Sequence, residues 1–225
     1  MGKAKQIRLD FISKHDADII IKKYHYSGKV KNNSKINIGV FYNGFCEGAL
    51  EFGPSNDKRK MIILVKNTKW NEFIELNRFA LSDNLPRNSE SRCISIAIRM
   101  IKKHYPFVRW IISFADACQC GDGTIYRAAG FDLIQVRKNL DLVTKDGVVL
   151  HTLAIKTGKG KHDFYNKSKG GSGAKFKPLR GYQIKYIKFL DKSYEKYLTV
   201  PILPYSTIKD MGAKMYKGIA AATTA

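Results

Sequence analysis

The spacing of apolar residues along this chain changes several times between every second residue and every third or fourth. Alternating apolar and polar residues predict half-buried strands, whereas helical spacing predicts amphipathic helices. Strands are therefore expected at residues 6–12, 36–42, 45–52, 73–81, 109–115, 131–138 and 148–156. Helices are expected at residues 14–24 and 89–104, with a short one inside 121–130. This order predicts an α+β protein with an α/β-type mixed sheet flanked by helices.

Local capping and turn signals agree with this order. Ser13 is suited to cap the first helix, because its hydroxyl can accept a backbone N–H of the first turn. Asn43 and Gly44 separate two expected strands, and Asn-Gly is the strongest two-residue hairpin signal. Gly130 is expected to end the short helix. Residues 56–60, which are rich in Lys and Arg, are expected to form a loop.

The composition of the chain changes near Lys156. From there to Lys188 the chain has ten Lys or Arg residues and one acidic residue, Asp163. A length of 225 residues suits one domain of moderate size with an extension. We therefore expect a core at residues 1–157 and a basic, aromatic-rich extension at residues 158–225 that packs on it.

The chain is strongly basic, with 40 Lys and Arg residues, 19 Asp and Glu residues and a net charge of +21. Because 44% of the residues are hydrophobic, the charge must decorate a folded globule, and its partner should be an anion. The longest apolar runs fall far short of the roughly 20 residues that cross a bilayer, so no membrane partner is expected. The four cysteines are too few for a disulfide framework, which favours a reducing cytoplasm.

The loop before the second long helix predicts a binding site for a pyrophosphate. A helix N-terminus offers unpaired N–H groups, to which arginines add positive charge and serines add hydroxyl donors. The alternative is that Ser89 is an ordinary N-cap. The layout of strand, loop, helix, strand and Tyr-bearing short helix is that of acyl-CoA transferases, and it favours the anion site. The candidate residues are Arg87, Asn88, Ser89, Ser91 and Arg92.

Tyr126 and Asp116 are candidate catalytic residues. Tyr126 lies on the expected short helix, where its phenol could donate a proton to a leaving thiolate. The alternative is a half-buried tyrosine that only packs. Asp116 ends an expected strand, at the carboxyl edge where open α/β sheets place their ligands, and the alternative is a turn or helix cap.

His25 and Tyr26 are candidate metal ligands at the end of the first helix. An imidazole, a phenolate and the Asp116 carboxylate would form an open site of nitrogen and oxygen donors. On these residues alone, an ordinary surface or core histidine is the commoner interpretation. Cys118 and Cys120 have the wrong spacing for a zinc knuckle or a redox pair, and metal binding by them is the alternative.

The basic segment after Lys156 has the composition of a nucleic-acid surface, because lysines suit phosphates and aromatic rings suit base stacking. A solvated charged face is the alternative, and this signal does not separate DNA from RNA. The aromatic residues are Phe164, Tyr165, Phe176, Tyr182, Tyr186 and Phe189. The residues expected to contact phosphates are Lys159, Lys161, Lys167, Lys169, Lys175, Lys177 and Arg180.

Taken together, these segments resemble the Mom family of bacteriophage DNA-modification proteins, which itself resembles the Gcn5-related N-acetyltransferase (GNAT) superfamily. The loop before the second long helix departs from ordinary acetyltransferases, because it lacks their glycine pair. The similar segments run in order over nearly the whole chain, at residues 24–27, 75–79, 85–95, 113–116, 123–131 and in the C-terminal pattern FLDK…VPILPYS…GAKMYKG.

The resemblance implies a GNAT-like fold and an enzyme that converts adenine in double-stranded DNA to N6-carbamoylmethyladenine, which shields phage DNA from host restriction. It also implies acetyl-CoA, or a related acyl-CoA, and iron as Fe²⁺. By resemblance His25, Tyr26 and Asp116 are ligands or near-ligands of the iron, whereas Arg78, Ser91 and Tyr126 are cofactor-site or catalytic residues. The expected location is the cytoplasm of the infected or lysogenic bacterial host.

Within this resemblance, the pantetheine arm is expected along residues 73–81, with Tyr126 facing the thioester sulfur and the target adenine flipped out of the duplex. Two rival interpretations stay open. One is an ordinary N-acetyltransferase that acts on a protein or small amine, and the other is a non-catalytic DNA-binding protein on the same scaffold. The oligomeric state is also open, with a dimer as one option.

Overall fold

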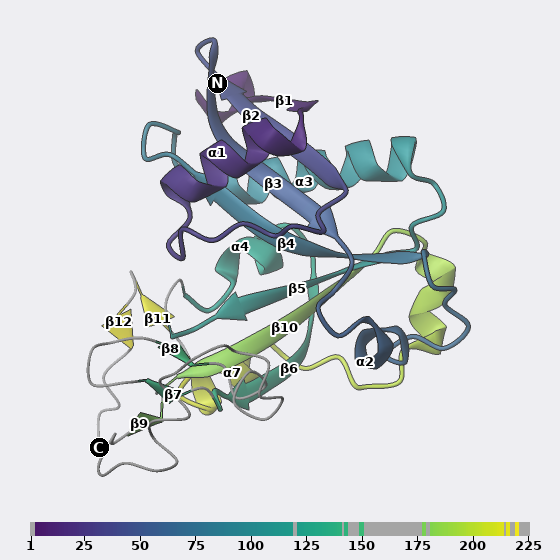
Figure 1. Cartoon of the computed structure of the whole chain (residues 1–225). Coiled ribbons are helices and arrows are strands. Elements are labelled where there is room, and N and C mark those ends of the chain that lie inside the picture. Colours follow the sequence, from purple (N-terminus) through teal and green to yellow (C-terminus); the bar gives the residue numbers. More distant parts are fainter. Residues whose placement is uncertain are drawn as a thin grey trace, which may run out of the picture.

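The computed structural model describes residues 3–118, 121–140, 142–143, 149–150, 177–178, 181–213, 215–216 and 219–220. A seven-stranded sheet forms its centre, with helices on both faces (Figure 1). The strand order is β1-β2-β3-β4-β5-β10-β6, and neighbouring strands are antiparallel except for the parallel pair β4 and β5. The predicted α+β class, with a mixed sheet flanked by helices, is confirmed.

Most of the predicted elements are present. The strands of the sheet are β1 Arg8–Phe11, β2 Ile36–Tyr42, β3 Phe45–Gly53, β4 Phe73–Leu81, β5 Trp110–Asp116, β6 Asp132–Lys138 and β10 Tyr182–Phe189. The helices are α1 Lys14–Tyr24, α2 Lys58–Ile62, α3 Ser89–His104, α4 Thr124–Ala128 and α7 Ser206–Asp210, with 3-10 helices η1 Lys3–Gln6 and η2 Lys192–Tyr197. Short strands are β7 Leu142–Val143, β8 Val149–Leu150, β9 Lys177–Pro178, β11 Met215–Tyr216 and β12 Ile219–Ala220. The basic loop predicted at 56–60 is wrong in part, because α2 begins within it, and only β8 of the strand predicted at 148–156 lies among the described residues.

The local signals act as predicted. Ser13 Oγ accepts the backbone N–H of Asp16 at 3.0 Å and so caps α1. Asn43 and Gly44 adopt φ angles of 50° and 85° between β2 and β3, which is the left-handed pair that a tight hairpin requires. Gly130, with φ 75°, follows α4 and donates its N–H to the carbonyl of Arg127. These signals work because each depends on only a few neighbouring residues.

The two faces of the sheet bury different elements. On one, here called the α3 face, α3 and α4 cover apolar side chains that include Leu50, Phe52 and Ile111. On the other, here called the α1 face, α1 packs on Ala49 and Ala80. Helix α2 and η2 cover the α1 face at the start of β5, where Trp110 is buried. Alternation along each strand explains this division, because successive side chains point to opposite faces.

Strand β10 lies within the segment predicted as an extension, yet it is inserted in the sheet between β5 and β6. Its position corrects the prediction that Tyr186 and Phe189 stack on bases, because both side chains are buried in the core. The division of the chain at residue 157 stays a prediction, although the sheet extends across it. No helix within the described ranges is long and apolar enough to span a bilayer.

Candidate active site

The sheet opens between β4 and β5. These strands pair only where Phe73–Glu75 lie beside Trp110–Ile112, although β4 continues to Leu81 and β5 to Asp116. Figure 1 shows the two strands diverging beyond this contact. The opening leaves stretches of two central strands without a neighbour on one side, so their backbone groups can bind a ligand there.

A bulge in β4 lies where the pairing with β5 ends. Glu51 of β3 pairs with Arg78 and Phe52 pairs with Leu76, so Asn77 is the extra residue. A bulge bends its strand and increases the local twist, and this accounts for the divergence of β4 from β5. Beyond the last pair, the buried hydroxyl of Ser113 has no hydrogen-bond partner among the described side chains. A buried polar group of this kind is costly unless something binds it.

Arg78 holds the loop that follows α1 against β4. Its Nε donates to the carbonyl of Lys29 at 2.8 Å, and a terminal nitrogen donates to the carbonyl of Asn77 at 2.7 Å. His25 lies at the end of α1, where its backbone N–H donates to the Ile21 carbonyl. Arg78 thereby ties the bulge in β4 to the loop that carries two of the predicted metal ligands, His25 and Tyr26.

His25 is held as a neutral imidazole. Its Nδ1 accepts the backbone N–H of Ser27 at 3.2 Å and lies 2.9 Å from the Ser27 hydroxyl. Burial, together with the positive charge of Arg78, lowers the pKa of His25 to about 4. The proton of the neutral ring therefore lies on Nε2. The ring of Tyr26 lies 4.3 Å from that of His25, and the Tyr26 side chain is 55% exposed.

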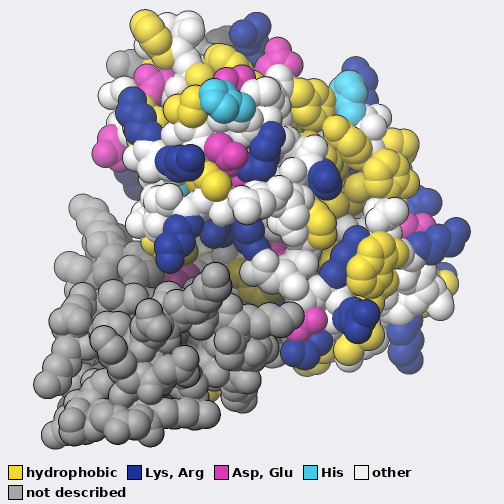
Figure 2. Space-filling view, in the orientation of Figure 1, with side chains coloured by type: hydrophobic (Ala, Val, Ile, Leu, Met, Phe, Trp, Pro, Cys, Tyr) yellow, Lys and Arg dark blue, Asp and Glu magenta, His cyan; other side chains and the backbone are white. Residues whose placement is uncertain are grey.

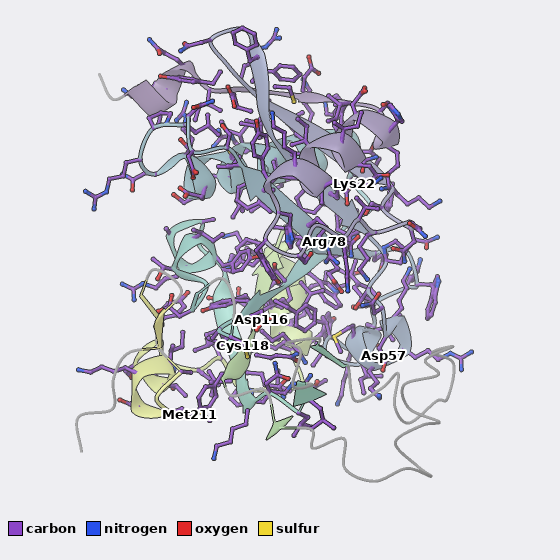
Figure 3. The ribbon with its side chains drawn as sticks, turned by 60° about the vertical axis from the view of Figure 1, so that its left-hand side comes forward. Lys22, Asp57, Arg78, Asp116, Cys118 and Met211 are labelled. Atoms are coloured by element: carbon purple, nitrogen blue, oxygen red, sulfur yellow. The ribbon has the colours of Figure 1, made fainter. Side chains whose placement is uncertain are left out.

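Asp116 lies at the end of β5, where its Oδ1 accepts the backbone N–H of Cys118 at 2.9 Å. This contact matches the turn-cap alternative. Asp116 pairs with Gln183 of β10 and lies two residues beyond Phe114, so its side chain belongs to the α1 face. Figure 3 labels Arg78 on β4, Asp116 at the end of β5 and Cys118 just beyond it.

The predicted iron ligands meet the chemical requirements of a metal site only in part. His25 is neutral, as a ligand must be, and the set contains nitrogen and oxygen donors. Within the described part of the chain, however, no three side chains of the His, Cys, Asp and Glu types converge. Cys118 Sγ accepts from the Asn139 amide at 3.1 Å, and Cys120 lies outside the described residues.

Tyr126 projects from α4 into the α3 face and is 8% exposed. Its ring lies 5.3 Å from that of Tyr186 and 5.6 Å from that of Phe131. Tyr186 pairs with Ser113, which places Tyr126 next to β5 just beyond the pairing with β4. The predicted helix position is confirmed, and the ring also packs as the structural alternative foresaw. Its catalytic role stays a prediction.

Tyr186 fixes the start of α4, a role that the sequence did not indicate. Its hydroxyl donates to the carbonyl of Asp122, and its ring lies against Gly123. A Cβ on Gly123, whose φ is 78°, would lie 2.5 Å from the ring. Burial raises the pKa of Tyr186, so its phenol stays protonated and keeps donating. The only sequence signal was strand periodicity, which predicts burial but no partner.

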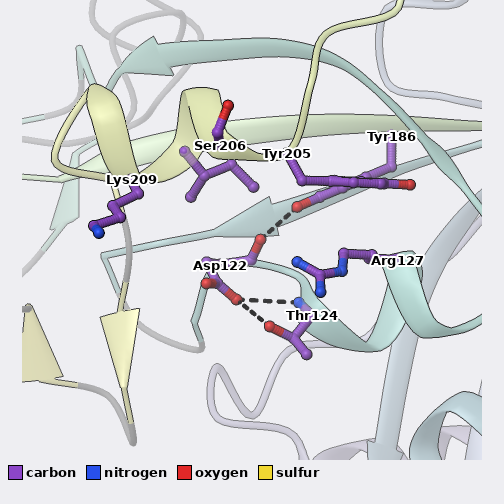
Figure 4. A pocket seen from close by; sticks show the side chains of 8 residues that line it. Asp122, Thr124, Arg127, Tyr186, Tyr205, Ser206 and Lys209 are labelled. Atoms are coloured by element: carbon purple, nitrogen blue, oxygen red, sulfur yellow. Dashed lines mark hydrogen bonds between the residues drawn. The ribbon is translucent and has the colours of Figure 1, made fainter.

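A cavity of about 200 Å³ lies behind α4 (Figure 4). The Asp122 carboxylate accepts the backbone N–H and the hydroxyl of Thr124 there, at 3.1 and 2.7 Å. The guanidinium of Arg127 lies 5.3 Å from the ring of Tyr205, whose hydroxyl donates to the Phe131 carbonyl. These contacts connect α4 with the segment around α7 and so support the helix that carries Tyr126.

The loop before α3 differs in detail from the prediction. The N-cap position is Asn88, which has φ 68° and makes no side-chain cap, so the N-cap alternative for Ser89 is wrong. The Ser89 hydroxyl donates to the Pro86 carbonyl and is buried, so an anion there would meet the backbone rather than this hydroxyl. Arg87 and Asn88 are exposed.

The other two residues predicted to bind the pyrophosphate, Arg92 and Ser91, already make hydrogen bonds within the protein. Arg92 donates to the carbonyl of Lys5 at 3.5 Å, and its buried Nε has no partner among the described residues. The carbonyl of Ser91 accepts the Ser95 hydroxyl at 2.8 Å. The pyrophosphate site stays a prediction. The same holds for the seven basic residues predicted to contact DNA, because of these only Lys177, in β9, lies among the described residues.

Comparison with known proteins decides the family. The model of the Mom protein family matches residues 6–207. The chain belongs to the Mom family. A curated member, the methylcarbamoylase mom of Escherichia phage Mu, is 35% identical over 206 residues, which cover 88% of this chain and 82% of that protein. The resemblance inferred from the sequence is confirmed.

Solved structures provide more distant likenesses to this Mom family member. The ribosomal-protein-S18-alanine N-acetyltransferase of Escherichia coli is 13% identical, with a TM-score of 0.46, over 82% of this chain and 94% of that chain. An acetyltransferase of Bacillus cereus is 9% identical, with the same TM-score, over 82% and 99% of the two chains. A GNAT family acetyltransferase of Elizabethkingia anophelis with acetyl-CoA bound is 12% identical, with a TM-score of 0.41, over 82% and 99%.

Proposed function

We propose that this protein converts adenine in double-stranded DNA to N6-carbamoylmethyladenine, with an acyl-CoA as donor of the two carbons. The observation that carries the proposal is the Mom family match over residues 6–207, with a relative named as a methylcarbamoylase. The net charge of +21 supports a polyanionic substrate. The enzyme would act in the cytoplasm of the infected or lysogenic host and protect phage DNA from restriction.

The structure of the product determines which atoms and electrons the reaction must balance. Adenine N6 loses one hydrogen and bonds to the methyl carbon of the acetyl group, which also loses one hydrogen. The thioester carbonyl exchanges sulfur for an ammonia-level nitrogen, and free CoA thiol leaves. The sum is a two-electron oxidation, so the reaction requires an electron acceptor besides the amine source. Plain acetyl transfer would instead join N6 to the carbonyl carbon without oxidation.

The two faces of the sheet suit two substrates that meet in the opening between β4 and β5. Tyr126 lies on the α3 face, where its phenol would donate a proton to the departing CoA thiolate. Asp116 lies on the α1 face, where its carboxylate would accept the proton of N6. The acyl-CoA would therefore enter from the α3 face and the DNA from the α1 face.

The opening supports the acyl-CoA part of the proposal. The backbone of β4 beyond Glu75 is not paired with β5, so it can hydrogen-bond to the amides of a pantetheine arm. The buried Ser113 hydroxyl offers a further donor or acceptor next to it. The positive charges of Arg87 and Arg92 suit the pyrophosphate, as the resemblance implies.

The proposal includes an iron ion bound by His25, Tyr26 and Asp116. When bound, iron would supply the redox chemistry that C–H activation needs. The ring of His25 is neutral, as a ligand must be, but its proton lies on Nε2, so binding through Nε2 requires that proton to move to Nδ1, which lies 2.9 Å from the Ser27 hydroxyl. The test is the iron content of purified protein, which should fall in His25→Ala and stay unchanged in His15→Ala, an exposed histidine on α1. Equal iron in both variants would remove His25 from the ligand set.

The reaction is tested on DNA from cells that express the protein. Plasmid DNA is digested to nucleosides, and its deoxyadenosine species are compared by mass spectrometry. Wild type and the control Tyr42→Phe, a tyrosine at the end of β2, should give the carbamoylmethyl adduct, and Tyr126→Phe should give little. An acetyl adduct would instead indicate plain acyl transfer, and unmodified adenine from folded protein would favour the two rival functions.

A further inference from the structure

Phe114 is an exposed aromatic residue on a central strand of the sheet. Its ring is 37% exposed, whereas Ser113 and Ala115 beside it on β5 are buried. Phe114 lies on the stretch of β5 beyond its pairing with β4, where the strand is paired with β10 only. Single exposed apolar side chains are common on protein surfaces, so what makes Phe114 a candidate binding surface is its position at the opening between β4 and β5, two residues before Asp116.

Phe114 is exposed because it lies beyond the part of the α1 face that α2 and η2 cover. At the start of β5, the side chains of Trp110 and Ile112 on this face are buried in the cluster that α2 and η2 complete. Phe114 follows Ile112 on the same face, and it belongs to none of the buried clusters. The apolar character of the face therefore continues beyond its helical cover, up to Asp116.

The surroundings of the Phe114 ring are polar and mostly cationic. Lys185 pairs with Phe114 across β5 and β10, and its Nζ lies 5.8 Å from the ring centroid. Burial and the neighbouring charge of Arg137 lower the pKa of Lys185. Arg137 also donates to the side chain of Gln183, the partner of Asp116 in the ladder. An apolar ring with cations beside it suits a flat, electron-rich group attached to phosphate.

The position of Phe114 relates this surface to the proposed chemistry. Phe114 is the second residue beyond the last β4–β5 pair, and Asp116 lies two residues further on the same face. In the space-filling view, Lys and Arg side chains, with some Asp and Glu among them, lie over α1 and in the area below it (Figure 2). A duplex drawn to these charges would present its bases to the opening.

We propose that the Phe114 ring is the platform on which the flipped target adenine stacks, with Lys185 at its rim, so that N6 faces Asp116. A flipped base must replace the stacking that it loses in the duplex, and enzymes of this kind supply aromatic or apolar side chains for it. This inference rests on the proposed function, because it assigns the base-binding residue of the same site. The occupant is a DNA base, and the adenine ring of CoA is the alternative that the test excludes.

The first arm of the test measures stacking without the reaction. In Phe114→Trp, a single-stranded oligodeoxyadenylate should quench the new tryptophan fluorescence, and an abasic strand of equal length should not. Wild type, which contains Trp70 and Trp110, gives the background fluorescence. Equal quenching by both strands, or quenching by CoA alone, would overturn the proposal. This arm decides the point even if the protein proves to modify no adenine.

The second arm measures plasmid modification at varied DNA concentration. Phe114→Ala should raise the KM for DNA by roughly 5- to 150-fold, the range expected for loss of one stacking partner, and Phe114→Trp should restore it. The matched control is Phe45→Ala, which removes a 71% exposed ring at the start of β3 and should change nothing. CoA affinity and melting temperature should be the same in all variants. An unchanged KM in Phe114→Ala, or a loss of CoA affinity in it, would contradict the assignment.

Discussion

The burial of His25 links the stability of the protein to pH. Burial lowers the pKa of this imidazole in the folded chain from 6.5 to about 4. At neutral pH the ring is neutral in both states. As the pH falls from 6.5 towards 4, only the unfolded chain binds the proton, so the free energy of unfolding decreases through this window. Below it, both states are protonated and this contribution changes no further.

The pH prediction is checked with thermal melts of wild type and His25→Gln. The melting temperature of wild type should fall more steeply between about pH 6.5 and about pH 4 than that of the variant, because the amide does not titrate. The acid-induced decrease that remains in His25→Gln belongs to other groups. Parallel curves for the two proteins would show that His25 is not buried as a neutral ring.

Gly123 and Gly28 provide a matched pair for the contact that holds α4. Both have left-handed φ angles, of 78° and 58°, but a Cβ would meet the Tyr186 ring only at Gly123 and has open space at Gly28. Gly28→Ala should cost about 1 kcal/mol through backbone strain alone. Gly123→Ala should cost about 1–3 kcal/mol more, because the ring must shift.

The measurement for this pair is denaturant unfolding, combined with plasmid modification. Gly123→Ala should lose more modification than its stability loss explains, since the shifted ring no longer fixes Tyr126. Equal free energies of unfolding in the two variants would contradict the close approach of Tyr186 to Gly123.

At the scale of elements, Arg78 joins β4 to the loop after α1. Its two hydrogen bonds reach the carbonyls of Lys29 and Asn77 at once. A lysine carries a single ammonium and cannot reproduce this planar fork. Arg78→Lys should therefore loosen residues 25–31, speed their amide hydrogen exchange and lower plasmid modification by about tenfold, equivalent to about 1.4 kcal/mol of transition-state stabilisation.

The control for Arg78→Lys is Arg99→Lys, an exposed arginine on α3. It should change neither the exchange of residues 25–31 nor the modification. Slow exchange of that loop in Arg78→Lys would mean that the loop is held by other contacts.

Elements whose signals are local could be predicted from the sequence, and their arrangement could not. The hairpin at Asn43 and Gly44 and the Ser13 cap depend on a few adjacent residues, so their signals are complete in the sequence. The insertion of β10 between β5 and β6 depends on pairing with strands about 50 to 70 residues away, for which periodicity gives no partner. The bulge at Asn77 is defined by the pairing of β4 with β3, so neither the bulge nor the opening of the sheet could be predicted from the residues of β4 alone.

The same distinction applies to the candidate site. The sequence indicated Tyr126 and Asp116 because each follows a recognisable element, and the structure places them on opposite faces near one opening. It did not indicate Phe114 or Tyr186, because alternation predicts a side chain's face and not what covers it. Ser89 was expected to offer its hydroxyl to a ligand or a cap, but Asn88 takes the cap position through its left-handed backbone.

At the scale of the whole molecule, the net charge of +21 predicts DNA binding that weakens steeply with salt. Each phosphate contact adds about 0.9 to the slope of log affinity against log salt, because counterions are released. Replacing all seven basic residues predicted to contact phosphates with glutamine should reduce this slope by about 6. Fluorescence anisotropy of a labelled duplex at several salt concentrations measures it. An unchanged slope would assign the phosphate contacts to other lysines and arginines.

The central claim is that the two carbons of an acyl-CoA become attached to adenine N6 in DNA. It is tested most directly by incubating purified, iron-replete protein, an amine source and an electron acceptor with plasmid DNA and acetyl-CoA labelled with ¹³C at both acetyl carbons. We predict a carbamoylmethyl-deoxyadenosine heavier by two mass units than the adduct from unlabelled acetyl-CoA. An adduct without the label, or no adduct from protein that still binds CoA and DNA, would contradict the account.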